Sequence, residues 1–193
     1  MIYIPKNLPK KYAAVLVYAI TASKHDPIIT TQELLLQMNM TNTQSHRKFI
    51  NDTLQSLIRL DVISGTKLKS NKYELQMNEV DLKTNNYCAV DYYDINKIMN
   101  LDAKCNKLDL VDYYITLVST INYKTHVGFT SIITLSKRCQ MVIATISRYN
   151  RILKDNKIIF FVTSKKQGIS NRYGLFRDKD EVIKAAKEVG IWY

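Results

Sequence analysis

The chain has 193 residues, of which 46% are hydrophobic and 23% are charged. This composition excludes a disordered or low-complexity chain, and the length suits two domains of about 80 to 100 residues each. Lys and Arg outnumber Asp and Glu by 28 to 17, so the net charge of +11 favours a phosphate-bearing partner.

The positive charge is unevenly distributed along the chain. Residues 1–80 carry ten basic and six acidic side chains, residues 81–125 carry five and six, and residues 126–193 carry thirteen and five. The C-terminal third is therefore expected to be the main binding region for a polyanion.

Membrane insertion, disulfide bonds and metal binding are not expected. No apolar stretch approaches the ~18 residues that span a bilayer, and Pro5 and Pro9 interrupt the segment where a signal peptide would lie. The three cysteines are widely spaced, with no Cys-x-x-Cys pair, and the three histidines are far apart in sequence. We therefore expect a cytoplasmic protein without a metal or other cofactor.

The first predicted element is an amphipathic helix from Lys10 to about Ser23, because apolar residues recur there at helical spacing. Pro27 ends any preceding helix, and residues 27–30 are expected to be extended. Thr31 is predicted to cap a short helix that contains Leu34 and Leu35.

A polar turn at residues 39–42 precedes a longer predicted helix from Thr43 to Leu60. In this helix Ile50, Leu54 and Leu57 form one apolar stripe. A hairpin follows, with its tip at residues 70–71 and alternating apolar residues in its second strand. The predicted order is therefore helix, strand, helix, turn, helix, hairpin.

The same order is predicted a second time. A helix carries an apolar side from Leu108 to Val118, residues 127–130 are extended, and Ser131 caps a helix that contains Leu135. Residues 139–141 form the turn. The next helix runs from about residue 142 to 155, and its inward residues are expected to be Val142, Ile146, Tyr149 and Leu153.

A second hairpin follows, with strands near residues 158–162 and 172–176. The two copies align without gaps from Ile50 against Ile146 onward, at an offset of 96. Upstream, Leu35 matches Leu135 at an offset of 100, so the repeat is structural and not verbatim.

These patterns predict an α+β protein, mainly α with small β-hairpins, built from two tandem winged-helix (helix-turn-helix) domains. The first domain is expected at residues 1–80 and the second at 108–177, with a polar linker and a short helix at 81–107. A C-terminal helix is expected at 178–193, where Asp178 and Glu181 have capping-box spacing and Gly190 ends the helix.

The second copy resembles the helix-turn-helix of replication initiators and DnaD-like proteins from Gram-positive plasmids, phages and integrative elements. The resemblance is carried by residues 129–137, 144–153 and 156–159, and it is looser over residues 10–77. The turn departs from the family pattern, because Cys139-Gln140-Met141 stands where Gly and Ser are usual. The resemblance implies binding to double-stranded DNA and a role in replication initiation.

The longer helix of each copy is predicted to enter the major groove, with its polar side toward the bases, while the hairpin follows the DNA backbone. In the second copy the candidate DNA-binding residues are Gln140, Ala144, Thr145, Ser147, Arg148, Arg151, Lys165, Lys166, Asn171 and Arg172. In the first copy they are Gln44, Lys48, Asn51, Lys67, Lys69 and Lys72.

Asp52 in the first copy occupies the position of Arg148 in the second. A carboxylate repels phosphate, so the first copy is expected to bind DNA more weakly or to serve another purpose. Gln and Asn side chains on the first copy also favour a site that contains adenine.

Catalysis is not expected. None of the five glycines precedes Lys-Ser or Lys-Thr, so no ATP-binding phosphate loop is present. A rolling-circle nuclease needs clustered histidines beside a nucleophilic Tyr, and the tyrosine pairs at 92–93 and 113–114 are interpreted as core and interface aromatics. The acidic pairs Asp91 with Asp94 and Asp109 with Asp112 are interpreted as caps or solvated charges.

The sequence therefore predicts a non-enzymatic protein that binds double-stranded DNA during replication initiation of a plasmid or other mobile element. A transcriptional repressor of the same fold remains an alternative, because fold alone does not separate the two roles. A protein-assembly adaptor is a further alternative, compatible with Asp52. All three functions are compatible with a homodimer or with binding to a replication partner protein.

Overall fold

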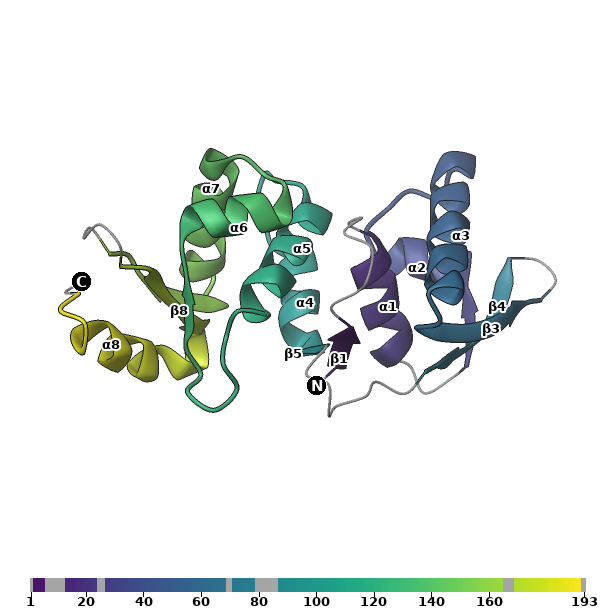
Figure 1. Ribbon diagram of the computed structural model, residues 1–193. Helices are drawn as coiled ribbons and strands as arrows, with labels where there is room; N and C mark the ends of the chain where they lie inside the picture. The colour runs from purple at the N-terminus through teal and green to yellow at the C-terminus, as the bar shows by residue number, and fades with distance from the viewer. Residues whose placement is uncertain are drawn as a thin grey trace. The chain divides into compact units, whose positions relative to one another are not determined.

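The computed structural model describes residues 2–5, 13–23, 27–68, 71–78, 87–164 and 169–191. Helices and small antiparallel sheets alternate along the chain, which makes the protein α+β (Figure 1). The chain divides into two compact units. The first comprises Met1–Leu101 with Asn106–Asp112, and the second comprises Asp102–Cys105 with Tyr113–Tyr193.

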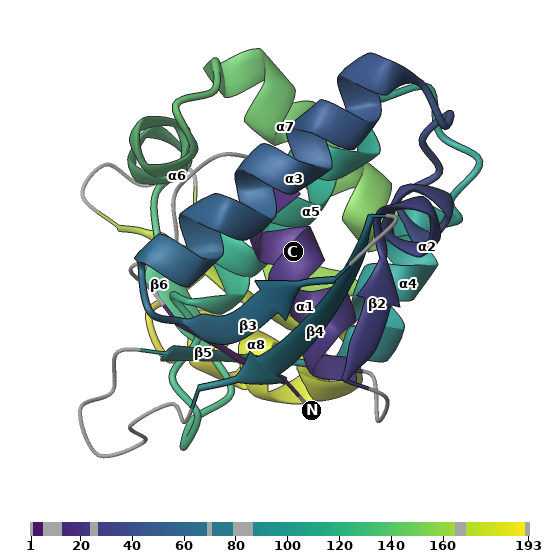
Figure 2. The same cartoon turned by 90° about the vertical axis from the view of Figure 1, so that its right-hand side faces the viewer.

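The first unit contains two antiparallel sheets. One is the pair β1-β5 and the other has the order β2-β4-β3. Its elements are β1 (Ile2–Pro5), α1 (Ala13–Ser23), β2 (Ile28–Thr30), α2 (Thr31–Gln37), α3 (Gln44–Arg59), β3 (Ile63–Lys67), β4 (Lys72–Met77), β5 (Tyr87–Val90) and α4 (Tyr92–Met99). Figure 2 shows α3 above the β2-β4-β3 sheet. The order predicted for the first copy is present, and residues 10–12 of the first predicted helix lie outside the described residues.

Helix α2 begins one residue earlier in the chain than the sequence predicted. Thr30 is the N-cap, and its side chain accepts from the Glu33 N–H while the Glu33 carboxylate accepts from the Thr30 N–H at 2.7 Å. The prediction that Thr31 caps this helix was wrong. Thr31 is fully buried. Its hydroxyl lies 3.3 Å from two acceptors, Asn51 Oδ1 and the Asn71 carbonyl oxygen.

The apolar stripe of α3 packs inward as its periodicity indicates. Ile50, Leu54 and Leu57 are all fully buried. In strand β4, Tyr73 and Leu75 are buried while their neighbours Lys72 and Glu74 are exposed, so the alternation along this strand separates its core face from its solvent face.

The segment predicted as a linker belongs largely to the first unit. Strand β5 pairs with β1, with Ile2 opposite Val90, and the Asn39 amide donates to the carbonyl of Met99 in α4. The short helix predicted in this segment is present, capped by the Asp91 side chain. Strand β5 was not predicted, because a short strand is defined by its distant partner and not by its own composition.

The second unit shares the arrangement of one three-stranded sheet with the first. Its sheet has the order β6-β8-β7, the counterpart of β2-β4-β3. Its elements are α5 (Lys107–Val118, which crosses the boundary between the units), β6 (Gly128–Thr130), α6 (Ile132–Cys139), α7 (Ile143–Asp155), β7 (Ile159–Val162), β8 (Asn171–Leu175), the 3-10 turn η2 (Phe176–Asp178) and α8 (Lys179–Lys187). Ile146, Leu153 and Ile159, aligned with Ile50, Leu57 and Ile63, are buried like their counterparts.

The start of α6 agrees with the sequence, and the start of α7 does not. Ser131 caps α6 by accepting from the Thr134 N–H at 3.0 Å. Val142, predicted to point inward, is instead the N-cap of α7 and is 69% exposed. An N-cap residue has non-helical backbone angles, so its side chain leaves the helical stripe.

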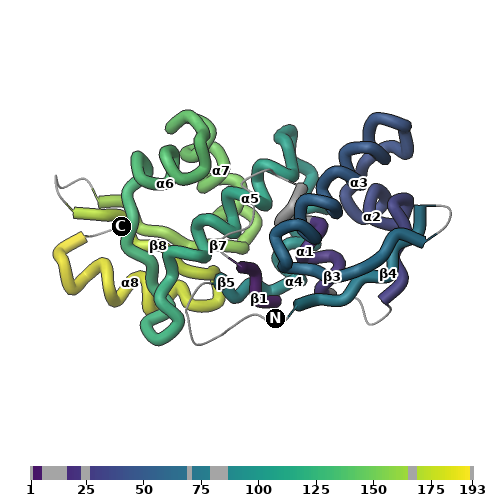
Figure 3. Tube along the Cα trace, turned by 45° about the vertical axis from the view of Figure 1, so that its right-hand side comes forward, coloured from purple at the N-terminus to yellow at the C-terminus, as the bar shows by residue number. Residues whose placement is uncertain are grey.

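Helix α8 covers the side of β7 and β8 that faces away from α6 and α7 (Figure 3). Its Val182 and Ala186 join Val127, Val162 and Ile191 in an apolar cluster. The close approach depends on a glycine in β8, because a Cβ added at Gly174 would lie 2.5 Å from Val182 Cγ2.

The predicted capping box at the start of α8 was wrong. Asp178 makes no capping hydrogen bond with its side chain. Its carboxylate lies instead 3.7 Å from His126 Nδ1 and 3.9 Å from Arg177 Nε. The helix ends at Lys187, with Glu188 as its C-cap, and so before the predicted end at Gly190. Gly190 follows in the turn with a left-handed φ of 69°.

Candidate nucleic-acid interface

Helix α7 presents one side to the core and the opposite side to solvent. Ile146, Tyr149, Asn150 and Leu153 are buried. The side chains predicted to point outward lie as expected: Ala144, Ser147, Arg148 and Arg151 are exposed, as is Gln140 in the preceding turn, and Thr145 is half-buried. Gln140 has a φ of 55°, and this left-handed residue reverses the chain between α6 and α7.

Basic residues are concentrated in the sequence of the second unit between its first short strand and the end of its hairpin. From His126 to Arg177 the sequence has ten Lys and Arg residues and a single acidic residue, Asp155. Lys137 and Arg138 on α6 are exposed, as are Arg148 and Arg151 on α7. Asp155 lies at the last position of α7, so no carboxylate interrupts the cationic surface of α6, the turn and the first three turns of α7.

Arg148 also has a structural contact. Its Nη2 donates a hydrogen bond to the carbonyl of Lys104, which precedes α5. The guanidinium is therefore directed toward this carbonyl, and Arg151 has no such contact among the hydrogen bonds of the described residues.

The hairpin differs from its predicted role at Arg172. The sequence places this cation on the exposed wing, yet only 7% of the residue is exposed. Its guanidinium lies 4.5 Å from the centre of the Phe129 ring, and Nη1 donates to the Ser170 carbonyl at 2.6 Å. Burial lowers the pKa of this guanidinium, and Nε is buried without a hydrogen-bond partner in the described part of the chain. Lys165 and Lys166 lie outside the described residues.

A chain of hydrogen bonds joins α5, α7 and the hairpin. The Tyr113 hydroxyl donates to Asn150 Oδ1, and the Tyr173 hydroxyl accepts from Asn150 Nδ2 at 3.5 Å and from Asn171 Nδ2 at 3.0 Å. Asn171 Oδ1 in turn accepts from the Ser164 N–H at 3.0 Å. Burial raises the pKa of both tyrosines, so they remain neutral donors and acceptors at ordinary pH.

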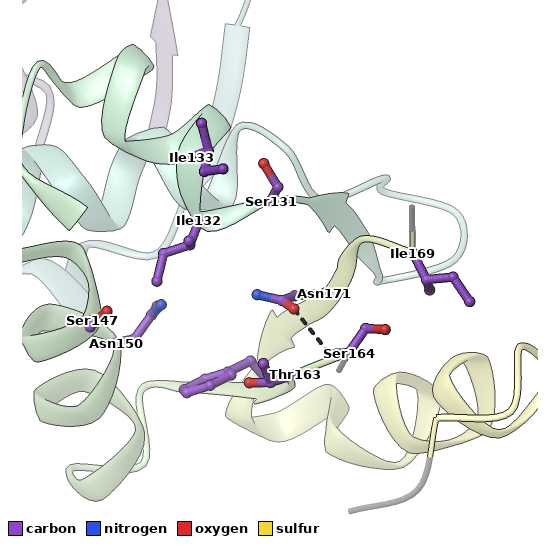
Figure 4. Close-up of a pocket in the computed structure, with 10 residues that line it drawn as sticks. Ser131, Ile132, Ile133, Ser147, Asn150, Thr163, Ser164, Ile169 and Asn171 are labelled. Carbon is purple, nitrogen blue, oxygen red and sulfur yellow. Dashed lines mark hydrogen bonds between the residues drawn. The ribbon is translucent and has the colours of Figure 1, made fainter. Parts of the chain in front are cut away.

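A hollow of about 420 Å³ lies between the start of α6, the middle of α7 and the hairpin. Figure 4 shows its three walls, with Asn150 and Asn171 directed toward its interior. It is lined by Ser131, Ile132, Ile133, Ser147, Asn150, Phe161, Thr163, Ser164, Ile169 and Asn171. None of these side chains carries a charge at neutral pH, so the cations do not line the hollow.

Exposed apolar side chains near the starts of α6 and α7 were missed by the sequence prediction. Val142 and Ile143 are 69% and 47% exposed at the start of α7, and Ile133 in α6 is 54% exposed. The sequence does contain a signal for them. Two adjacent residues of a helix point in different directions, so a narrow inward stripe accommodates only one of them. The adjacent apolar residues Val142 and Ile143 therefore indicate that at least one is exposed.

The corresponding surface of the first unit, on α3 and its hairpin, is less cationic than that of α6 and α7. Gln44, Lys48 and Asp52 are exposed on α3, and Lys67 and Lys72 are exposed on the hairpin, while Lys69 lies outside the described residues. The carboxylate of Asp52 therefore stands on the outer side of α3 as predicted.

Asn51 does not belong to the outer side of α3. It is half-buried, and its Oδ1 accepts from the Tyr73 hydroxyl at 2.7 Å and from the Thr31 hydroxyl at 3.3 Å. The predicted contact of Asn51 with DNA is therefore replaced by a contact between α3 and the sheet.

Among the described residues, no group of three or more His, Cys, Asp or Glu side chains is placed to hold a metal ion. Within the same part of the chain, no helix has the length and apolar character required to cross a bilayer. Comparison with known protein families, curated proteins and solved structures found no significant match.

Proposed function

We propose that the protein binds double-stranded DNA through two winged helices, and that the second unit supplies most of the affinity. The observation that supports this most directly is the cationic surface of α6 and α7, where Lys137, Arg148 and Arg151 are exposed without an intervening carboxylate. Phosphates attract such a surface, because each neutralised phosphate releases condensed counterions.

The shape of the second unit suits this partner. A helix of about 10 to 12 Å diameter fits the major groove, which is about 12 Å wide. The chain of hydrogen bonds from Tyr113 to Ser164 connects α7 to the hairpin, so both elements approach DNA as one surface. In this arrangement α7 contacts base edges, and the hairpin follows the sugar-phosphate backbone.

Replication initiation on a mobile element is the biological role that we propose. The alternative is an assembly adaptor, in which the first unit binds protein. Leu36 on α2 and Tyr93 on α4 are 75% and 70% exposed, and the Tyr92 hydroxyl donates to Gln37 Oε1 at 3.4 Å, so these two helices are neighbours. Asp52 disfavours phosphate at the position that corresponds to Arg148.

The direct test is DNA binding by the full chain, measured by fluorescence anisotropy over a range of salt concentrations. Replacing Lys137, Arg148 and Arg151 together by Gln is expected to weaken duplex binding by at least tenfold. It should also flatten the slope of log K against log salt by about two to three. The control replaces Lys179, Lys184 and Lys187 by Gln, which removes the same charge from exposed positions on α8.

Helix α8 lies on the side of the hairpin sheet opposite α6 and α7 (Figure 3), so the control triple should change the slope by less than about one. Equal losses from the two triples would show nonspecific attraction to the whole unit and contradict the proposed surface. Failure of the native chain to bind duplex DNA would contradict the function itself.

A further inference from the structure

The start of α7 lacks the features that normally stabilise a helix N-terminus. Its N-cap is Val142, which makes no capping hydrogen bond, and its first turn contains no acidic residue. Ser, Thr, Asp or Asn at this position would each accept from an orphan N–H of the helix. Val142 therefore does not stabilise the start of α7 through a cap. It also contributes little through apolar burial, because it is 69% exposed.

Two further apolar side chains stand beside Val142 in the first turn. Ile143 is 47% exposed, and Ala144 is exposed on the outer side of the helix. Arg148 and Arg151 follow on later turns, and Gln140 precedes them in the turn. The apolar group is thus small and is followed along the same helix by two arginines, so a polyanion that also displays small apolar groups suits it.

The predicted contact of Arg148 with guanine competes with the hydrogen bond that Arg148 donates to the Lys104 carbonyl, which occupies one of its guanidinium nitrogens. The residues left at the N-terminal end of the helix are apolar, and this end is the part of a recognition helix that reaches the bases. In the major groove the only exposed methyl group is that of thymine.

We propose that Val142, Ile143 and Ala144 contact thymine methyl groups in the major groove, so that thymine at the facing positions determines which duplexes the second unit prefers. This inference rests on the proposed function, because it assumes that α7 enters the groove. It replaces recognition of guanine by arginine with recognition of thymine by apolar contact.

The test uses the full chain and a duplex selected from a random pool. Each thymine in the selected site is replaced in turn by deoxyuridine, which removes only the methyl group, and affinity is measured by anisotropy at fixed salt. At one to three positions the replacement is expected to weaken binding about fourfold, the effect of losing contact with one buried methyl group.

The variant Val142→Ser separates recognition from folding. Ser caps a helix better than Val, so the melting temperature should stay unchanged or rise. Binding to the thymine duplex should nevertheless weaken, and the difference between thymine and deoxyuridine should shrink toward onefold. The matched control is Val189→Ser, which alters another exposed valine of the second unit, after α8, and should preserve the thymine preference.

The outcomes distinguish the two proposals. Tight duplex binding with no effect of deoxyuridine at any position would overturn the thymine inference and leave DNA binding intact. A native chain that binds no duplex would overturn the function on which the inference rests. A native dimer that Val142→Ser converts to a monomer, observed by light scattering, would assign the apolar group to a second copy of the chain and overturn the thymine contact.

Discussion

Asn150 is a neutral amide with 3% exposure in the middle of α7. A buried amide costs stability unless it is hydrogen-bonded, and Tyr113 and Tyr173 supply its partners. The first unit contains a counterpart, in which Tyr73 of the central strand donates to Asn51 of α3. A Tyr in the central strand that contacts an Asn in the long helix is thus common to both units.

Tyr173→Phe is expected to lower the free energy of unfolding by about 1 to 2 kcal/mol, because the amides of Asn150 and Asn171 lose their shared acceptor. Chemical denaturation followed by circular dichroism measures the change. Tyr123→Phe is the control, since Tyr123 is 75% exposed, and it should stay within about 0.5 kcal/mol of the native chain. Equal effects of the two substitutions would refute a structural role for the Tyr173 hydroxyl.

Helix termini show how local chemistry sets the limits of an element. Helix α2 begins with a reciprocal capping box between Thr30 and Glu33, whereas α7 begins with an uncapped Val142. The two helices occupy different places in their units, and only the second exposes apolar residues at its start. A cap is therefore absent at the helix end that we propose to enter the DNA groove.

Thr30→Ala should destabilise the protein by about 1 kcal/mol, because the backbone N–H of Glu33 at the start of α2 loses its acceptor, the Thr30 hydroxyl. Thr53→Ala provides a control of the same chemical type inside α3. There the hydroxyl only donates back to the Phe49 carbonyl, and Ala favours a helix interior, so this change should be neutral or stabilising. Thermal unfolding of both variants measures the sign, and destabilisation by Thr53→Ala alone would reverse the expected order.

At the scale of the whole molecule, the two units share an order of elements and differ in charge. The outer side of α3 carries Asp52 together with Lys48, while the outer side of α7 carries Arg148 and Arg151 without a carboxylate. Electrostatic attraction to DNA should therefore be unequal between the units.

Replacing Lys48, Lys67 and Lys72 of the first unit by Gln should flatten the salt dependence of duplex binding by less than about one. The same measurement on the Lys137, Arg148 and Arg151 triple should give a loss of about two to three. Both triples remove three exposed cations from a long helix and its neighbouring elements. A larger loss from the first unit would reverse the assignment, and equal losses would mean that both units bind DNA alike.

The sequence alone was sufficient for features that depend on residues close together in the chain. Helical spacing correctly predicted that Ile50 and Ile146 are buried and that Arg151 is exposed. The hydroxyl of Ser131 caps α6 as its position before an apolar run indicates. Such features follow from a period of 3.6 residues and from cap geometry, which are local properties.

Only the tertiary structure decided features that depend on distant partners. Arg172 is buried because Phe129, in another strand, lies beneath its guanidinium. Asn51 faces the sheet because Tyr73 supplies a hydroxyl, and β5 forms because it meets β1 from the opposite end of the unit. An isolated cation, amide or short strand has the same local pattern whether such a partner is present or absent, so its environment is determined only when the chain folds.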